Sequence, residues 1–314
     1  MKRHDRASGP LARPFHVGYC AAGHDDALGP VATGSNLPTR TMTVLDHLGF
    51  GCVALSTLAS PRASRDLLEG VFELGLRHFD TAPIYGRGYS EILLSEFLRG
   101  KRDKVSVATK FGMSPSRRPR LPSGLAMRLN TLRRRLRPPA RPSPVETSPP
   151  IRPPATRRRI GRAELEASFD SSCRALGTDH VDLYLLHEEV PSALEPAAVD
   201  FLQELRASNR VRQLGLAANG SRYLDLEPAD LAPWNVLQYE FGPAWPAHAG
   251  LLRQFPAKTH IFHSCLRGVS PTAASGTEPG RVLAGCLAAN PSGRVLFSST
   301  NLAHVRANLR VIGG

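Results

Sequence analysis

The feature that most constrains the fold of this 314-residue chain is a regular alternation of short apolar segments with longer helical ones. Short runs rich in β-forming residues are each followed by a segment whose apolar residues recur at helical spacing. Glycine stands at the expected end of several helical segments, for example at Gly75 and Gly177. About eight such repeats favour a closed parallel (β/α)8 barrel, the TIM barrel, over an open sheet.

The boundaries of these segments follow from the same periodicity. One helix is expected to open at Ser60-Pro61, because serine caps helices and proline suits the first helical position. Further helices are predicted from about residue 90, from 165 to 176, and over 194–207, 248–255, 281–289 and 301–310. The predicted strands span 48–55, 76–80, 104–110, 181–187, 211–217, 235–239, 261–264 and 295–298.

Residues 113–160, between the third and fourth predicted strands, differ in composition from the rest of the chain. They hold eleven prolines and thirteen arginines but a single acid, Glu146, and so carry +12 of the net charge of +13. Such a composition cannot build a packed core, so we expect an Arg/Pro-rich insert that forms a solvated loop or a lid. Alternatively, leucines at 125, 129, 132 and 136 indicate a short basic amphipathic helix that docks on an anionic partner or a membrane surface.

The basic charge says little about the rest of the protein, because it is confined to this insert. Nucleic acid or membrane contact through 113–160 is therefore a minor alternative to a barrel that handles a small molecule. If the insert is a mobile lid, its arginines would favour anionic substrates.

The remaining parts of the sequence carry weaker signals. Residues 1–40 lack the apolar stretch of a secretory signal, so we expect a disordered leader before a barrel over 41–314. The sequence stops directly after the last predicted helix, so we expect an open pocket. Cysteines at 20, 52, 173, 265 and 286 show no CxxC spacing. We therefore expect a reducing, cytoplasmic setting and no metal site.

Four polar residues end or closely follow consecutive predicted strands, namely Asp80, Tyr85, Lys110 and His187. Each is unremarkable alone, since a lysine at a strand end is usually a surface charge and a histidine is usually packed in a core. Parallel barrels, however, collect their catalytic groups at the C-terminal ends of the strands. We therefore expect these four side chains to meet at one mouth of the barrel.

Their chemistry is complementary. A phenol with a pKa near 10 is a poor acid at neutral pH, and a buried ammonium from Lys110 would lower the pKa of Tyr85. Asp80 would in turn neutralise the buried lysine. His187 would orient a carbonyl oxygen by hydrogen bonding. Together they form a proton donor aimed at a developing alkoxide, which is what carbonyl reduction requires.

Three stretches carry a resemblance to a known family: GLRHFDTAPIYG at 75–86, VATKF at 107–111 and LYLLH at 183–187. In this order they resemble the motifs of the aldo-keto reductase family, and the likeness extends over 43–310 apart from the insert. The resemblance implies that Tyr85 is the general acid/base, tuned by Lys110 and Asp80, and that His187 helps to bind the carbonyl. Hydride would pass between a nicotinamide cofactor and the substrate carbon.

The resemblance also implies a set of cofactor contacts. They are expected to contact three parts of the cofactor: the nicotinamide carboxamide, the nicotinamide face and the adenosine end. At the nicotinamide face, histidine replaces the usual tyrosine. The candidates are Asn219, Gln238, His263, Ser264, Ser299, Thr300, His304 and Asn308, with Cys52 as a further contact or simply a buried apolar residue. NADP is the expected cofactor and NAD is possible, since Ser298 and His304 replace the usual basic residues and only Arg294 or Arg306 is at hand for the 2′-phosphate.

From these observations we expect an NAD(P)-dependent oxidoreductase that interconverts an aldehyde, ketone or sugar carbonyl and its alcohol. The alternative is a catalytically weak cofactor-binding sensor or interaction protein built on the same barrel. The altered nicotinamide contacts motivate that alternative.

Overall fold

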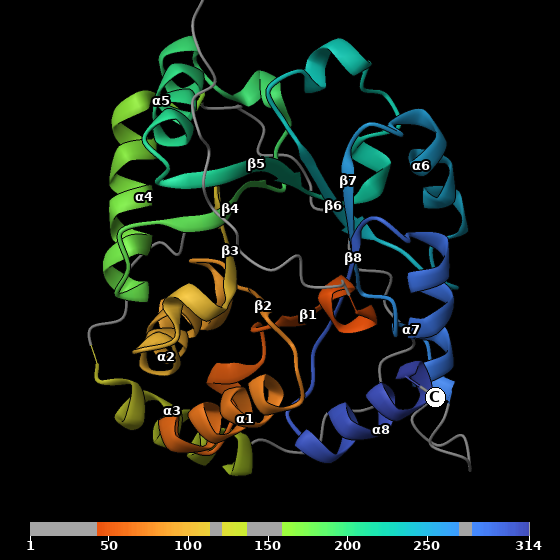
Figure 1. The fold of residues 1–314 in the computed structure, drawn as a ribbon. Coiled ribbons are helices and arrows are strands. Elements are labelled where there is room, and N and C mark those ends of the chain that lie inside the picture. The colour runs from red at the N-terminus through yellow and green to blue at the C-terminus, as the bar shows by residue number, and fades with distance from the viewer. Residues whose placement is uncertain (1–42, 114–120, 137–158, 270–277, 314) are drawn as a thin grey trace, which may run out of the picture. The chain divides into compact units, whose positions relative to one another are not determined.

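Eight parallel strands pair in sequence order, and the eighth closes on the first to complete a barrel (Figure 1). The computed structural model describes residues 43–113, 121–136, 159–269 and 278–313. All of these lie within one unit, Met42–Gly314. The strands are β1 Leu48–Gly51, β2 His78–Asp80, β3 Ser106–Phe111, β4 Val181–His187, β5 Val211–Ala217, β6 Val236–Glu240, β7 Thr259–His263 and β8 Arg294–Phe297. The predicted TIM barrel is thus confirmed.

Helices surround the barrel on its outside (Figure 1). In the first of them, Ser60 Oγ accepts a hydrogen bond from the Ala63 amide at 3.2 Å and Pro61 occupies the first turn, as the sequence predicts. The helices are α1 Pro61–Glu73, α2 Tyr89–Leu98, α3 Ser123–Leu136, α4 Arg162–Leu176, α5 Pro196–Ala207, α6 Gly250–Gln254, α7 Glu278–Ala289 and α8 Leu302–Gly313. The helix expected over 248–255 is split, because a 3₁₀ turn at Pro246–Ala249 precedes α6.

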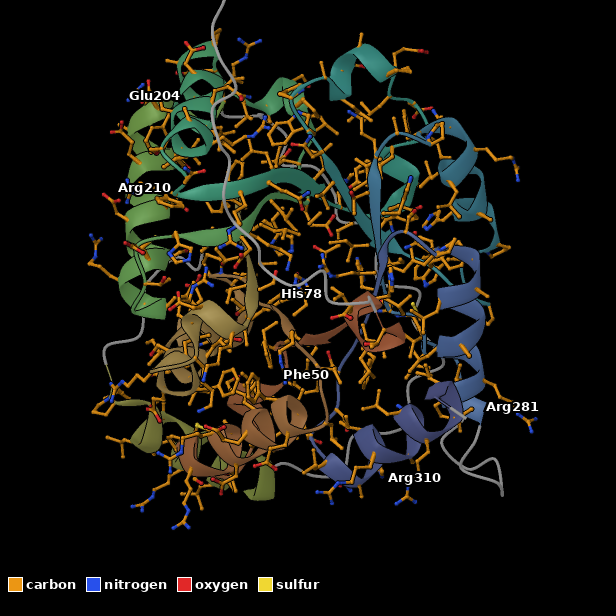
Figure 2. All side chains as sticks on the ribbon, viewed as in Figure 1. Phe50, His78, Glu204, Arg210, Arg281 and Arg310 are labelled. Carbon is orange, nitrogen blue, oxygen red and sulfur yellow. The ribbon has the colours of Figure 1, made fainter. Side chains whose placement is uncertain are left out.

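The core has two layers, which the alternation of side chains along each strand explains. In β4, Leu183 and Leu185 point into the barrel, whereas Tyr184 and Leu186 pack under the helices. Figure 2 shows the outcome: Phe50 and His78 lie deep among the strands, while Glu204, Arg210, Arg281 and Arg310 lie at the periphery. No helix in the described part of the chain is long and apolar enough to cross a bilayer.

The insert contains an ordered helix. Residues 123–136 form α3, so this part follows the helical alternative rather than the predicted loop. The rest of the insert, 114–120 and 137–158, and the predicted leader, 1–40, lie outside the described residues.

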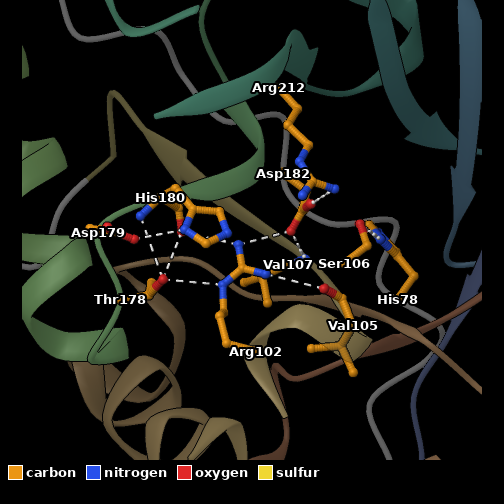
Figure 3. A network of polar contacts seen from close by, with 10 residues as sticks. All are labelled: His78, Arg102, Val105, Ser106, Val107, Thr178, Asp179, His180, Asp182 and Arg212. Atoms are coloured by element: carbon orange, nitrogen blue, oxygen red, sulfur yellow. Dashed lines mark hydrogen bonds and ion pairs between the residues drawn. The ribbon is translucent and has the colours of Figure 1, made fainter. Parts of the chain in front are cut away.

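The barrel end at which the strands begin is held by a buried carboxylate (Figure 3). Asp182 Oδ2 lies 2.9 Å from Arg102 Nη2 and accepts a hydrogen bond from the Val107 amide at 2.8 Å. Its other oxygen lies 2.9 Å from Arg212 Nη1. Since three donors surround it, this carboxylate joins β3, β4 and β5, and it lies at the barrel end opposite Asp80 and His187.

Candidate active site

A buried ion pair lies at the C-terminal ends of β2 and β3. Lys110 Nζ donates hydrogen bonds to Asp80 Oδ1 at 2.6 Å and to the Thr81 carbonyl at 2.9 Å. The second oxygen of Asp80 accepts a hydrogen bond from Gln238 Nε2 at 3.0 Å. Burial alone would lower the pKa of Lys110, but Asp80 and Tyr85 outweigh it and raise that pKa above its ordinary value. The ammonium is therefore charged, as the sequence predicts.

Tyr85 is presented to this pair by a turn with left-handed backbone geometry. The 3₁₀ turn Tyr85–Gly88 contains Gly86 at φ 57° and Arg87 at φ 58°, and α2 begins directly after it. A side chain at position 86 would run into Ser56, so glycine is needed there for space as well as for its φ angle. The turn brings the centroid of the Tyr85 ring to 4.9 Å from Lys110 Nζ.

The protonation of Tyr85 differs from the sequence prediction. Burial raises the pKa of the phenol more than Lys110 lowers it, and Asp80 raises it further. The pKa of Tyr85 is therefore above its ordinary value of about 10 instead of below it. Lys110 does lower the pKa, as the sequence predicts, but the net shift has the opposite sign because burial, which the prediction did not weigh, is the larger effect.

His187 completes the group at the end of β4. Its ring meets the Tyr85 ring edge to face, with 6.0 Å between the ring centroids. Burial, with help from the charges of Lys110 and His263, lowers the pKa of His187 to about 3. The imidazole is thus neutral at neutral pH, and its buried Nδ1 has no hydrogen-bond partner among the described residues.

These side chains share one cavity of about 520 Å³ at the mouth of the barrel. The cavity extends from the strand ends that carry Asp80 and His187 to the loops that follow β7 and β8. Seven of the residues selected from the sequence line it: Asp80, Tyr85, Lys110, His187, Gln238, His263 and Ser264. No residue of α3 lines the cavity, and the predicted lid over it stays a prediction, because most of the insert lies outside the described residues.

Other predicted cofactor contacts lie elsewhere. The Asn219 amide donates to Glu240 Oε1 at 3.1 Å, and its oxygen accepts from the Ser221 amide at 3.0 Å, so both ends are engaged within the protein. Cys52 is fully buried, and burial raises the pKa of its thiol. None of these lines the cavity, nor do the candidates near the start of α8: Ser299, Thr300, His304 and Asn308.

The two arginines considered for the cofactor phosphate are also remote from the cavity lining. Arg294 is the first residue of β8, and the cavity lies at the other end of that strand, beside Phe297. Its expected role is corrected for this reason. Arg306 lies on α8 among Leu45 and Leu74, in a separate surface hollow.

Sequence reasoning missed two charged residues of the cavity. Glu188 follows His187 directly, with a φ of 55°, and its carboxylate lies 3.9 Å from Arg222 Nε. Arg267 lies in the loop after β7 and lines the cavity. The position of Glu188 next to a strand end was a usable signal, whereas Arg267 lies in an irregular loop that has no periodic pattern.

Among the residues that the structure describes, no group of three or more His, Cys, Asp or Glu side chains is arranged to hold a metal ion. The ionic chemistry of the cavity comes instead from the Lys110–Asp80 pair and from Glu188 and Arg267.

Comparison with known proteins agrees with this geometry. The chain is 27% identical over 247 residues to D-threo-aldose 1-dehydrogenase from Pseudomonas sp., a match that covers 76% of this chain and 67% of that protein. It is 31% identical over 216 residues to pyridoxal 4-dehydrogenase from Microbacterium luteolum, covering 61% of this chain and 58% of that one. This chain therefore spans about three fifths to two thirds of the length of these relatives.

Among solved structures, the fold resembles that of an aldo-keto reductase from Klebsiella pneumoniae in complex with NADPH. The TM-score is 0.56 at 16% identity, over 85% of this chain and 86% of that chain. The sequence profile of the aldo/keto reductase family matches residues 47–258, which is more than half of the chain. With the barrel and the ordered motifs already described, this match shows that the chain belongs to the aldo/keto reductase family.

Proposed function

We propose that this protein is an NADP-dependent oxidoreductase that interconverts an aldehyde, ketone or sugar carbonyl and its alcohol, with Tyr85 as general acid/base. The observation that carries the proposal is the meeting of Tyr85, Lys110 and His187 in one cavity, where Asp80 neutralises the lysine. The names of two relatives, a D-threo-aldose dehydrogenase and a pyridoxal dehydrogenase, support a small carbonyl or alcohol as substrate.

The residues of the cavity fit a nicotinamide cofactor. Gln238 Oε1 is buried without a partner among the described residues and is free to accept a hydrogen bond from a carboxamide. His263 and Ser264 lie nearby on the cavity wall, and Arg267 supplies a cation that suits a phosphate group. When bound, the reduced cofactor supplies the hydride that adds to the carbonyl carbon.

The protein supplies the proton and orients the substrate carbonyl. Because the pKa of Tyr85 is raised, the phenol is protonated at neutral pH and can donate to the carbonyl oxygen as that oxygen gains charge. Lys110 stabilises the phenolate that remains, and Asp80 holds the ammonium in place. Neutral His187 hydrogen-bonds to the same carbonyl oxygen and fixes its direction. In the reverse reaction Tyr85 accepts the proton of the alcohol.

The test is to follow oxidation of NADPH with a panel of aldehydes, ketones and sugars, for the native protein and for Tyr85→Phe. A general acid contributes about 10²- to 10⁴-fold, so the variant should lose at least about a hundredfold in kcat. Its affinity for NADPH, measured by fluorescence titration, should change little. A variant as active as the native protein on every accepted substrate would overturn the role of Tyr85.

A sensor that binds cofactor without turnover is the second candidate. It is favoured by one observation, the engagement of Asn219 by Glu240, which occupies a group expected to hold the carboxamide. Titration with NADPH and NADH, combined with the turnover assay, separates the two functions. A sensor would bind cofactor and reduce none of the carbonyls.

A further inference from the structure

Helix α3 packs on the barrel by one side and turns its leucines away from it. Ala126 and Met127 are buried, and the Leu121 carbonyl, just before the helix, accepts a hydrogen bond of 2.9 Å from Tyr89 Oη. By contrast, Leu125 is 47%, Leu129 39% and Leu132 54% exposed. The helical spacing of the leucines agrees with the sequence prediction, and the helix packs on the barrel by the opposite side.

This arrangement is unusual for a helix of a globular protein, because leucines at i, i+4 and i+7 ordinarily face a core. The seven exposed large apolar side chains identified in the described part of the chain include four between positions 121 and 132, with Leu121 as the fourth. We call Leu121, Leu125, Leu129 and Leu132 the leucine ridge. A concentration of apolar side chains on one surface indicates a site of interaction.

The charge around the ridge restricts what can bind there. Arg128 is exposed on the same helix, between two ridge residues in sequence. The sequence of α3 itself holds four arginines and no acid. A partner must therefore accept leucine side chains and also supply negative charge.

A second copy of this chain would bring like charges together and does not meet the second requirement. A protein partner with a matching groove usually covers about 800 Å² on each side, whereas the ridge is one row of side chains on and just before a helix roughly 21 Å long. An anionic bilayer requires no matched shape. It accepts leucines at the level of the headgroups and gains about 1 kcal/mol for each arginine near its surface.

We propose that α3 is a membrane-surface helix, and that its leucine ridge and the exposed Arg128 bind this protein to bilayers that contain anionic lipids. The proposal does not depend on the proposed catalytic function, because no residue of α3 lines the active-site cavity.

The experiment is flotation of the full chain with vesicles of phosphatidylcholine alone and of equimolar phosphatidylcholine and phosphatidylglycerol. We expect binding to the anionic vesicles, little binding to the neutral ones, and release as salt shortens the Debye length. The variant L125Q/L129Q/L132Q should bind more than about tenfold more weakly, since three apolar side chains no longer enter the bilayer. Removing one charge in R128Q should weaken binding roughly fivefold.

The matched control is L224Q, which alters a leucine that is 42% exposed away from α3 and should bind like the native protein. Thermal melts of all variants establish that the fold is intact. Equal binding by native protein and the triple-leucine variant would overturn the proposal. So would the absence of binding to anionic vesicles, or a native dimer that the triple-leucine variant dissociates, which would assign the ridge to a second copy.

Discussion

Lys110 Nζ lies 2.6 Å from Asp80 Oδ1, and both side chains are almost completely excluded from solvent. A buried ion pair of this kind contributes little net stability, because its attraction is offset by the cost of removing both charges from water. Removing one partner is different, since the other charge is then left buried alone. The ion pair is therefore tested by removing one partner and by removing both.

Replacing Asp80 by Asn should destabilise the protein by about 3–5 kcal/mol, because the Lys110 ammonium loses its counter-ion. The double variant Asp80→Asn/Lys110→Met should recover most of this loss. Both free energies of unfolding are measured by urea denaturation followed by circular dichroism. A loss below about 1 kcal/mol in the single variant would show that water reaches the ammonium, in contrast to the burial observed.

The raised pKa of Tyr85 predicts how the two directions of the reaction depend on pH. Reduction uses the protonated phenol, so its kcat should be constant around neutrality and decline only above about pH 10. Oxidation of the alcohol uses the phenolate, so its kcat should rise with pH through the same range. Steady-state rates in both directions, measured between pH 6 and 10.5, check this, because the ordinary pKa of a tyrosine phenol is about 10. Parallel profiles in the two directions would contradict it.

His187 should make the protein less stable in acid. Its pKa is about 3 in the folded protein but about 6.5 in the unfolded chain, so between these values only the unfolded chain binds the proton. Stability therefore falls as pH drops from 6.5 towards 3, by up to about 1.4 kcal/mol per pH unit from this group. Urea midpoints across this window should show a shallower pH dependence for His187→Gln.

The control for that measurement is His304→Gln, because His304 is exposed on α8. Its midpoints should follow those of the native protein at every pH. An unchanged slope in His187→Gln would mean that the buried imidazole takes up a proton without unfolding.

The network around Asp182 should affect stability without affecting chemistry. Asp182→Asn leaves the arginines on either side of it without their buried carboxylate, and should cost about 3–5 kcal/mol. Arg212→Gln should cost less than about 1 kcal/mol, since the Arg212 side chain is 68% exposed. The kcat of both variants, measured well below their melting temperatures, should match the native value. A loss of kcat in Asp182→Asn would show that the two ends of the barrel are coupled.

The fold could be predicted from the sequence because the period of the apolar residues reports directly on the environment of each strand. The predicted bounds of β4 and β5 agree with the structure, since polar residues mark three of their four ends: His180 and Glu188 flank β4, and Arg210 precedes β5. β2 is shorter than predicted, because Leu76 and Arg77 precede the first paired residue, His78. Apolar character alone does not separate a strand from the segment that leads into it.

The candidate site was predictable only in part. Residues at strand ends, such as Lys110 and His187, were found because the barrel fixes where strands end. The hydrogen bond of Gln238 to Asp80 spans 158 positions in the chain and leaves no local signal. The pKa of Tyr85 was misjudged because the balance between burial and charge depends on depth in the protein, which a sequence does not state.

The wide separation of the Asp182 network from the Tyr85 cavity has a consequence for how this gene tolerates change. Substitutions where strands begin should alter how much folded enzyme accumulates, and those where strands end should alter how fast each molecule works. A deep mutational scan that scores abundance and turnover separately would then divide its harmful variants into two sets, which map to opposite ends of the barrel.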